Sequence, residues 1–332
     1  MKTLIHILYT GGKFATCVLF FSASIFLIPG CKKDLDIVES PIENQGECTP
    51  ILPCNQVTIG GGYTYIYDPN SSTTPFFNPN NDNEFLFVSP CTGNINEKCI
   101  KIFNLQTKNT FTLYTGSLYY APRWGKNDWI LFCQDDENIY KIKSNGDSLT
   151  KLTNLNNLHH PIWNYDGTKF LAFTEASNLF SLLFDMNGNI LDTIYFGQTS
   201  NSNFQNPNYI VSNECHNVSF FNLNTNNIEF NYNYSKLISA MWGSVFWLSD
   251  NEVIYSNIAG LNRLSIPSLN NQNFKKSCNS KLYQWGDINS SKTKMIWSRG
   301  DYTQIDECTL KFKSRIYLMD IDGNNEQEID LN

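Results

Sequence analysis

Short runs of alternating apolar and polar residues recur along the chain, separated by polar turns. The clearest runs are Pro122-Arg123-Trp124, followed by Trp129-Ile130-Leu131-Phe132, and Pro161-Ile162-Trp163, followed by Phe170-Leu171-Ala172-Phe173. Each pair predicts a strand, a polar turn and a second strand, because alternation with a period of two is typical of half-buried strands. The two prolines lie 39 residues apart, so the pattern also indicates an internal repeat.

The repeat extends over six units. Weaker copies of the first signature surround positions 77, 209, 247 and 288. A second signature is an apolar strand that runs into a polar turn, and it ends at positions 104, 143, 185, 222, 265 and 320, with steps of 39, 42, 37, 43 and 55 residues. The two longest units carry insertions at 88–99 and 299–313. Paired signatures at this spacing predict six units of four short strands each.

Four short strands in about 40 residues are typical of a β-propeller blade. A single blade cannot bury both of its faces, whereas blades stacked in a ring bury them against their neighbours. We therefore predict an all-β fold, a six-bladed β-propeller of four-stranded antiparallel blades over residues 56–332, with approximate blades at 70–115, 116–154, 155–196, 197–233, 234–276 and 277–332. The aromatic residues expected in the seams between blades are Phe77, Trp124, Trp163 and Trp247.

Both ends of the predicted propeller carry strand-like segments. Residues 328–331 resemble the outer strand of the last blade, so the units run in phase to the C-terminus. Residues 63–67 carry tyrosines at alternate positions. This segment either adds to the edge of the last blade and latches the ring, or it opens the first blade.

Composition agrees with this fold. The 332 residues include 44 Asn and only 7 Ala, beside 19 Gly and 12 Pro. Asn, Gly and Pro favour turns and Ala is the best helix former, so the balance argues against a largely helical fold. The formal charge is −7 and no Lys/Arg cluster stands out in the body of the chain, which argues against nucleic acid as a partner.

Residues 1–30 have the pattern of a signal peptide. They contain two lysines, no acidic residue and an apolar run over 14–28, which is shorter than the about 20 residues of a membrane span. The run closes on Ile28-Pro29-Gly30-Cys31, which resembles a lipobox, the bacterial lipoprotein signal. That resemblance implies cleavage before Cys31 and acylation of this residue with fatty acids such as palmitate. The alternative is an ordinary secretory signal in which Cys31 is merely a cysteine.

The segment after Cys31 indicates a flexible tether and a sorting signal. Residues 31–55 are polar and contain three prolines, so we expect a lipidated, flexible tether. Lys32-Lys33-Asp34-Leu35-Asp36 resembles the short charged signals with which some Gram-negative lineages sort lipoproteins outward. We therefore expect a lipid-anchored protein of the cell envelope, at the outer membrane, facing either the periplasm or the exterior.

The third unit carries a family resemblance. Trp163-Asn164-Tyr165-Asp166-Gly167-Thr168-Lys169, followed by the strand at 170–173, resembles the WD40-like repeat of TolB-type propellers. The resemblance covers roughly residues 70–331 and implies a six-bladed propeller. Only this unit keeps the Asp-Gly pair, and the α/β domain that precedes the propeller in TolB has no room here.

Cysteine usage indicates an oxidising compartment. Of ten cysteines, removal of Cys17 with the signal and lipidation of Cys31 leave eight, an even number. The candidate disulfides are Cys48 with Cys54, Cys91 with Cys99, and Cys278 with Cys308. Cys133 and Cys215 fall in blades that do not touch, so buried thiols are expected there. No Cys-x-x-Cys occurs, and we predict neither a metal site nor a cofactor.

One face of the ring gathers the longer connections. If the strands of each blade run from centre to edge, the links between blades and between second and third strands emerge on one face, together with both insertions. We hypothesise that this face binds a partner, because loops on a rigid scaffold commonly carry function. The candidate binding residues are Tyr119, Tyr120, His159, His160, Trp242, Arg299, Asp301 and Tyr302.

The sequence favours binding over catalysis. The predicted mature chain has three histidines, too few for a multi-histidine metal site, and it lacks a Gly-x-Ser-x-Gly nucleophile motif. We therefore expect a non-catalytic module that binds an envelope protein or a glycan. The alternative is an exported glycan-active hydrolase or lyase with acidic residues at the channel mouth. Two carboxylates about 5–10 Å apart beside exposed aromatic residues would favour the enzyme.

Overall fold

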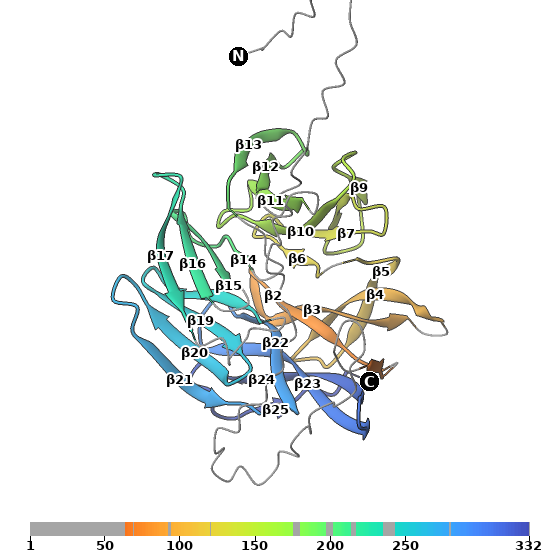
Figure 1. The fold of residues 1–332 in the computed structure, drawn as a ribbon. Helices are drawn as coiled ribbons and strands as arrows, with labels where there is room; N and C mark the ends of the chain where they lie inside the picture. The colour runs from red at the N-terminus through yellow and green to blue at the C-terminus, as the bar shows by residue number, and fades with distance from the viewer. Residues whose placement is uncertain are drawn as a thin grey trace, which may run out of the picture. The chain divides into compact units, whose positions relative to one another are not determined.

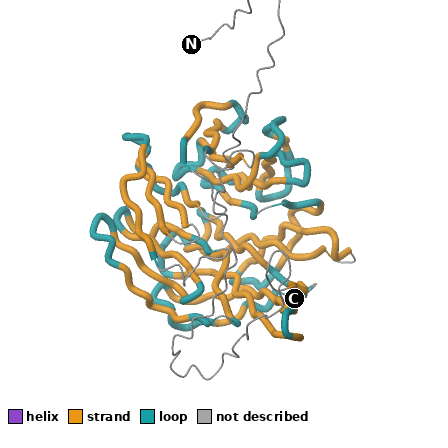
Figure 2. Tube along the Cα trace, in the orientation of Figure 1, coloured by secondary structure: helices purple, strands orange, loops and turns teal. Residues whose placement is uncertain are grey.

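The computed structural model describes residues 64–68, 70–91, 94–119, 121–174, 180–196, 202–213, 217–234, 243–278 and 280–331. The predicted signal peptide, Cys31, the tether and the pair Cys48 and Cys54 lie outside these ranges. Within them, the regular secondary structure consists of strands, and Figure 2 shows strands and loops without a helix. All described residues belong to one compact unit.

Six sheets form the six blades, and each contains four antiparallel strands. Blade 1 comprises β2 (Thr73–Asn78), β3 (Asn81–Cys91), β4 (Asn94–Asn104) and β5 (Thr110–Gly116), and blade 2 comprises β6 (Arg123–Trp124), β7 (Trp129–Cys133), β8 (Ile139–Lys143) and β9 (Thr150–Lys151). Blade 3 comprises β10 (Leu158–Trp163), β11 (Lys169–Thr174), β12 (Ser181–Asp185) and β13 (Ile190–Ile194). The blade count and the strand count per blade confirm the predicted fold class.

The second half of the chain repeats this arrangement. Blade 4 comprises β14 (Ser202–Asn203), β15 (Tyr209–Asn213), β16 (Asn217–Asn222) and β17 (Asn227–Asn233), and blade 5 comprises β18 (Val245–Ser249), β19 (Glu252–Asn257), β20 (Gly260–Ser265) and β21 (Asn271–Lys276). Blade 6 comprises β22 (Lys281–Ile288), β23 (Lys294–Asp306), β24 (Thr309–Asp320) and β25 (Gln327–Glu328). We call the four strands of each blade A to D in this order.

The A strands lie at the centre of the ring. Figure 1 shows β2, β6, β10, β14 and β22 towards the middle, with the D strands β5, β9, β13, β17 and β21 at the periphery. Strand β2 contacts both β6 and β22, so the first blade packs between the second and the last. The ring is therefore closed, and its A strands surround a central channel.

Each predicted repeat end coincides with the end of a C strand. The six positions pair with the first residue of the repeated B-strand segment in the same blade. The pairs are Glu84 with Asn104, Trp129 with Lys143, Lys169 with Asp185, Tyr209 with Asn222, Glu252 with Ser265, and Lys294 with Asp320. The spacing of the sequence signatures thus reflects one register that is repeated six times.

The predicted aromatic residues fill the seams. Trp124 packs against Leu86 and Ile100 of blade 1, and Trp163 packs in the cluster that contains Leu131 of blade 2. Phe77 lies in the seam between blades 6 and 1, and Trp247 in the seam between blades 4 and 5. All four side chains are almost completely buried, which confirms their predicted role. Burial of such rings is the main favourable contribution to blade packing.

Both termini close the ring on blade 6. Strand β1 (Thr64–Tyr67) pairs in parallel with β24, from Thr64 opposite Thr309 to Tyr67 opposite Phe312. Further along the same edge, β25 pairs antiparallel with Tyr317 and Leu318. Of the two alternatives for residues 63–67, the structure therefore supports the latch at the edge of the last blade.

Both predicted insertions lengthen B–C hairpins. Residues 88–99 extend β3 and β4, and the extension carries the predicted disulfide between Cys91 and Cys99, whose Cα atoms are 5.2 Å apart. Residues 299–313 extend β23 and β24 beyond the other blades. Cys133 is a buried free thiol, as predicted, and burial raises its pKa to about 12. Cys278 and Cys308 are both disulfide-bonded, while their pairing with each other stays a prediction.

Candidate functional site

The two faces of the ring are formed by different connections. The A–B turns (79–80, 125–128, 164–168, 204–208, 250–251 and 289–293) and the C–D turns lie on one face, because strands within a blade are antiparallel. We call it the turn face. The B–C and D–A connections emerge on the opposite face, which we call the loop face.

Polar groups on the turn face join neighbouring blades. Asn80 Nδ2 of blade 1 donates to the Lys126 carbonyl of blade 2 at 3.1 Å, and Asn127 of blade 2 donates to the Gly167 carbonyl of blade 3. Lys292 Nζ of blade 6 donates to the Leu248 carbonyl of blade 5 at 2.6 Å. These groups are occupied by the ring itself, so they contribute to blade register rather than to a ligand site.

Polar groups on the turn face also join the first and last blades. The Asp82 carboxylate in blade 1 accepts hydrogen bonds from Ser290 N at 2.9 Å and from Ser290 Oγ at 2.6 Å in blade 6. These bonds, with others from Ser291, hold the pKa of Asp82 below its usual value even though partial burial acts to raise it. The turn face therefore helps to close the ring.

Two of the predicted binding residues meet on the loop face. Tyr119 lies in the connection between blades 1 and 2 and keeps 42% of its surface exposed. Its ring lies 5.3 Å from the imidazole of His159, which is 2% exposed at the start of β10. An exposed tyrosine supported by a buried ring is a rigid aromatic contact point for a partner.

The remaining aromatic candidates are placed differently. Tyr302 is buried and packs against Phe312, with the ring centroids 4.8 Å apart, and its hydroxyl accepts a hydrogen bond from Gln284 Nε2 at 3.2 Å. Its ring therefore belongs to a small core inside blade 6. Tyr120 and Trp242 lie outside the described residues.

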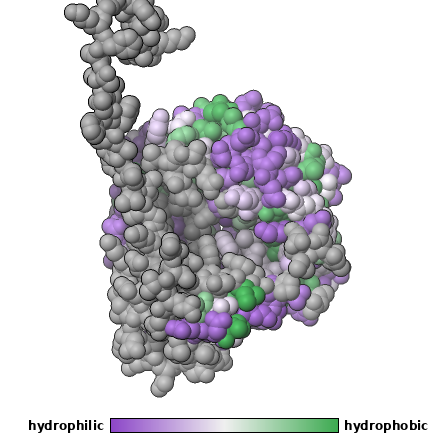
Figure 3. Space-filling model, turned by 45° about the vertical axis from the view of Figure 1, so that its right-hand side comes forward, coloured by the Kyte–Doolittle hydropathy of each residue, from purple (hydrophilic) through white to green (hydrophobic). Residues whose placement is uncertain are grey.

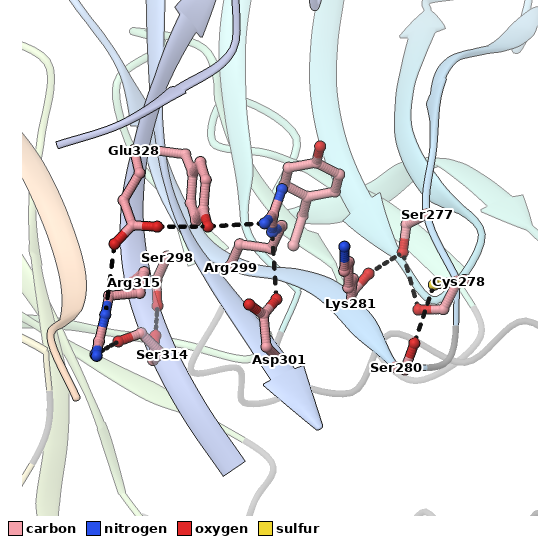
Figure 4. A network of polar contacts seen from close by, with 12 residues as sticks. Ser277, Cys278, Ser280, Lys281, Ser298, Arg299, Asp301, Ser314, Arg315 and Glu328 are labelled. Atoms are coloured by element: carbon pink, nitrogen blue, oxygen red, sulfur yellow. Dashed lines mark hydrogen bonds and ion pairs between the residues drawn. The ribbon is translucent and has the colours of Figure 1, made fainter. Parts of the chain in front are cut away.

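Arg299 and Asp301 belong to a polar network within blade 6 (Figure 4). Arg299 Nε lies 3.4 Å from Asp301 Oδ1, its Nη1 lies 3.3 Å from Glu326 Oε1, and its guanidinium stacks on the Tyr317 ring. Tyr317 Oη in turn donates to Glu328 Oε2 at 2.9 Å. Arg299 thus links β23 to the C-terminal residues, and its charge is already paired.

The charges in this network shift its pKa values. Burial acts to lower the pKa of Arg299, but the neighbouring Tyr317, Asp301 and Glu326 raise it above its ordinary value. Burial raises the pKa of Asp301, with the nearby Arg299 opposing the shift. The network is better suited to hold the C-terminal strand than to release a proton near neutral pH.

His160 marks the start of the channel wall. It has a positive φ of 48°, and a register shift separates His159 from Ile162 in the pairing of β10 with β11. Positive φ is uncommon for a residue other than glycine, and a bulge of this kind redirects a side chain. Burial, together with the charges of Arg123 and His159, holds the pKa of His160 well below its usual value. The imidazole is therefore neutral at physiological pH.

Strand register defines a ring of six equivalent positions in the A strands. They lie opposite the third residue of each repeated B-strand segment and are Phe76, Arg123, Ile162, Asn203, Phe246 and Asp287. Polar residues occupy this ring in blades 2, 4 and 6, and apolar residues occupy it in blades 1, 3 and 5. The apolar members Ile162 and Phe246 are buried in the seams between blades.

Arg123 and Asp287 are the charged members of the ring. Burial lowers the pKa of Arg123 to about 10, with the charge of Asp287 opposing the shift, so the guanidinium stays protonated at neutral pH. Burial raises the pKa of Asp287 to about 7, against hydrogen bonds from Ile288 N and Phe77 N and the charge of Arg123. Phe77 N donates to Asp287 Oδ2 at 2.9 Å, which ties blade 1 to blade 6.

A small hollow, open to solvent on one side, adjoins this ring beside blades 1 to 4. Its lining comprises Phe76, Arg123, Trp124, Ile162, Trp163, Ser202, Asn203, Phe204 and Gln205. Its volume of about 10 Å³ has room for about one water molecule, so this hollow is too small for a drug-sized ligand.

The sequence did not single out these channel residues. Arg123 lies inside the Pro-Arg-Trp repeat signature, but alternation alone assigns it to a strand face without saying what that face meets. A detectable signal exists, because Arg123, Asn203 and Asp287 each directly precede the apolar seam residue of an A strand, Trp124, Phe204 and Ile288.

The rest of the described surface offers weaker candidates. Figure 3 shows a largely hydrophilic surface with separate hydrophobic patches on the face in view. Exposed apolar residues such as Phe111, Tyr195 and Ile228 lie on or beside outer strands of different blades. No group of three or more metal-ligating side chains occurs among the described residues. A search of the same ranges finds no helix that is long and apolar enough to cross a membrane.

Comparisons with known proteins do not assign the chain to a family. No family model matches the chain, and no curated protein matches it. Among solved structures, the C-terminal WD40 domain of Sif2 is similar, with a TM-score of 0.41 and 9% sequence identity over 69% of this chain and 93% of that domain.

Proposed function

We propose that this chain is a lipid-anchored protein of the cell envelope whose TolB-like propeller binds a protein or a glycan without catalysis. The apolar run over 14–28 and the lipobox-like segment that ends at Cys31 support the anchor. The Trp163-to-Lys169 turn supports the likeness to TolB-type propellers. Binding takes place through the loop face and the channel.

The exposed features of the loop face carry the binding proposal. This face presents the lengthened hairpins and the exposed ring of Tyr119. Exposed loops on a rigid ring are typical of an interaction module.

The charges around Asp287 favour binding over glycan hydrolysis. Glycosidases use two carboxylates about 5–10 Å apart, and mutual repulsion is one way in which the proton of the acid is retained. Among the described residues, the charge that shifts the pKa of Asp287 is the guanidinium of Arg123, and burial rather than a second acid raises that pKa. The carboxylate also accepts hydrogen bonds that close the ring, which is a structural role.

Site-specific photo-crosslinking in cells tests this proposal. A photo-reactive phenylalanine analogue replaces Tyr119 on the loop face or, as a matched control, Tyr165 in the A–B turn of blade 3. The two tyrosines are 42% and 40% exposed, so the probes differ in face rather than in accessibility. We expect a discrete envelope adduct from position 119 and none from position 165, detected by mass spectrometry. Equal adducts from both positions, or none from position 119, would contradict a binding loop face.

A further inference from the structure

Two disulfide-bonded cysteines lie on the loop face at blade 6. Cys278 is in the connection that leads into β22, and Cys308 is in the turn between β23 and β24. The other described cysteines are excluded as their partners, because Cys91 pairs with Cys99 and Cys133 is a free thiol. Cys278 and Cys308 therefore bond either to each other or to cysteines outside the described residues.

Strand register argues against a bond between these two cysteines. Cys278 lies beside Lys281 (Figure 4), and Lys281 lies opposite Asp301 on β23. From Asp301 the hairpin continues to Asp306 before it reaches Cys308, and this length of strand extends about 17 Å. The Cα atoms of a disulfide are at most about 7 Å apart. The lengthened hairpin therefore carries Cys308 away from Cys278, which favours a separate partner for each.

The direction of β1 brings the N-terminal part of the chain to Cys308. Strand β1 runs parallel to β24, and Thr64 lies opposite Thr309, the residue that follows Cys308. Since β24 starts at a B–C turn, Thr64 lies at the loop-face end of this edge. The chain before Thr64 therefore reaches blade 6 at the tip of the lengthened hairpin, on the face that also holds Cys278.

The tether offers a cysteine at a suitable distance from this point. Cys54 precedes Thr64 by ten positions, a length that spans at most about 35 Å. Residues 60–62 are three consecutive glycines, which allow the chain to reverse its direction. Cys54 can therefore return to Cys308 beside the start of β1.

The second tether cysteine suits the second bond. Cys48 precedes Cys54 by six positions, and two prolines lie between them. An extended, proline-containing stretch of this length spans about 19 Å. This span is close to the offset of about 17 Å between the levels of Cys278 and Cys308 along the hairpin.

Cys215 is a less suitable partner. With the signal peptide removed and Cys31 lipidated, it is the remaining candidate beside the two tether cysteines. It lies between β15 and β16, in the B–C connection of blade 4. At that end of blade 4, Asn213 Nδ2 donates to the Ser256 carbonyl of blade 5 at 2.8 Å. Blade 5 therefore separates Cys215 from blade 6.

We propose that Cys48 and Cys54 form disulfides with Cys278 and Cys308, and we call these two bonds the staple. Each bond forms when two thiols lose two protons and two electrons to an oxidant protein, whose own disulfide is reduced to a dithiol. Such oxidants act in the bacterial periplasm and not in the cytosol. The staple therefore rests on the envelope location in the proposed function.

The staple shortens the free part of the tether. Thr64 follows Cys31 by 33 positions, whereas Cys48 follows it by 17. Flexible chains of these lengths have root-mean-square spans of about 32 Å and about 23 Å. The staple also makes the tether leave from the loop face, so this face is held towards the membrane. The partner of the loop face is then a component close to the membrane surface.

Peptide mapping without reduction tests the staple. The full chain is taken from the membrane fraction, alkylated, digested with trypsin and analysed by mass spectrometry. Cleavage leaves the cysteines that form the expected bonds in four peptides, 34–98, 99–101, 277–281 and 300–311. We expect one linked species that contains all four peptides, because the first holds both tether cysteines and Cys91. Reduction should release them.

Single variants assign each bond. Cys48→Ser and Cys54→Ser should each release one of the two blade 6 peptides, 277–281 or 300–311, and retain the other. Cys91→Ser is the matched control, because it removes the disulfide to Cys99 and should release peptide 99–101 alone.

Several results would overturn the staple. A direct bond between peptides 277–281 and 300–311, or a bond from either to 170–236, which holds Cys215, would assign other partners. Retention of both blade 6 peptides in each tether variant would contradict it as well. A formed Cys91–Cys99 bond beside reduced thiols in both blade 6 peptides removes this inference alone, since the compartment is then oxidising. Absence of every disulfide instead contradicts the envelope location in the proposed function.

Discussion

Asp287 combines two roles at one residue. Its carboxylate accepts the backbone N–H of Phe77 at 2.9 Å and so joins the first and last blades, yet it is buried beside the channel at only 6% exposure. Burial outweighs the hydrogen bonds and the charge of Arg123, so its pKa rises from 3.8 to about 7. At a pH between these two values, the Asp287 carboxyl is therefore protonated in the folded ring and ionised in the unfolded chain.

This shift predicts that stability falls as the pH rises from about 4 to 7. In that interval the folded state keeps the proton on Asp287 and the unfolded state has lost it, so raising the pH favours unfolding. A pKa difference of about 3 corresponds to at most about 4 kcal/mol. Asp287→Asn should flatten this part of the curve of unfolding free energy against pH, measured by denaturant titration. A curve that keeps the same slope in the variant would refute the assignment to Asp287.

The surroundings of individual residues are the features that the sequence predicts least well. Tyr302 lies in the 299–313 insertion, which suggests exposure, but the lengthened β23 and β24 fold it against Phe312 inside the blade. Arg123 and Asp287, 164 positions apart in the sequence, interact only because the ring closes. Alternation predicts which side chains share a strand face, but not what a distant blade places against that face.

At the scale of elements, strand β24 depends on both ends of the chain. Strand β1 covers its edge at 309–312, and β25 covers it at 317–318. Arg315 lies between them, donating to the Asn70 carbonyl at 3.0 Å and pairing with Glu328 at 3.5 Å. The edge of the last blade is therefore completed by segments from opposite termini.

Removal of β1 should destabilise the ring. A chain that begins at residue 69 lacks this strand, whereas a control that begins at residue 56 keeps it. Loss of about four backbone hydrogen bonds, each worth about 0.5–1.5 kcal/mol, should lower the melting temperature by several degrees. The unpaired edge should also promote self-association, visible by size-exclusion chromatography. Identical melting and elution of the two chains would rule out a stabilising role for the latch.

The repeated register was predictable because each C strand ends in a polar turn that the sequence marks. The strands that close the ring were less predictable from the sequence. Residues 63–67 alternate as any half-buried strand does, and the same pattern fits an opening strand of blade 1 or a parallel strand on blade 6. The choice depends on which edge is free after six blades have packed, and no local signal encodes that.

At the scale of the whole molecule, both faces of the ring contribute bonds between blades. The turn face joins blades through Asn80, Asn127 and Asp82. At the loop-face end of blade 4, Asn213 Nδ2 donates to the Ser256 carbonyl of blade 5 at 2.8 Å. The loop face also presents the exposed ring of Tyr119. Substitution of this exposed side chain should therefore change binding with less effect on stability than substitution of a group that joins two blades.

The proposed anchor gives a prediction for the whole chain. Cys31→Ser removes the acceptor for lipid, and two or three acyl chains are what makes such anchoring stable, so the variant should move from the membrane to the soluble fraction. Cys17→Ser, in the same N-terminal segment, should leave the distribution unchanged. Cell fractionation and immunoblotting measure both. Membrane retention of Cys31→Ser would exclude lipidation at this residue as the anchor.

The latch also fixes an order of events during synthesis. Strand β1 is made first and its partner β24 last, and the contact between Asn70 and Arg315 joins residues 245 apart. Blades 1 to 5 can form from local pairings as they leave the ribosome, but ring closure must wait for nearly the entire chain. A chain that stops before blade 6 leaves β1 without its partner strand. Completion of blade 6 is thus the step that closes the ring.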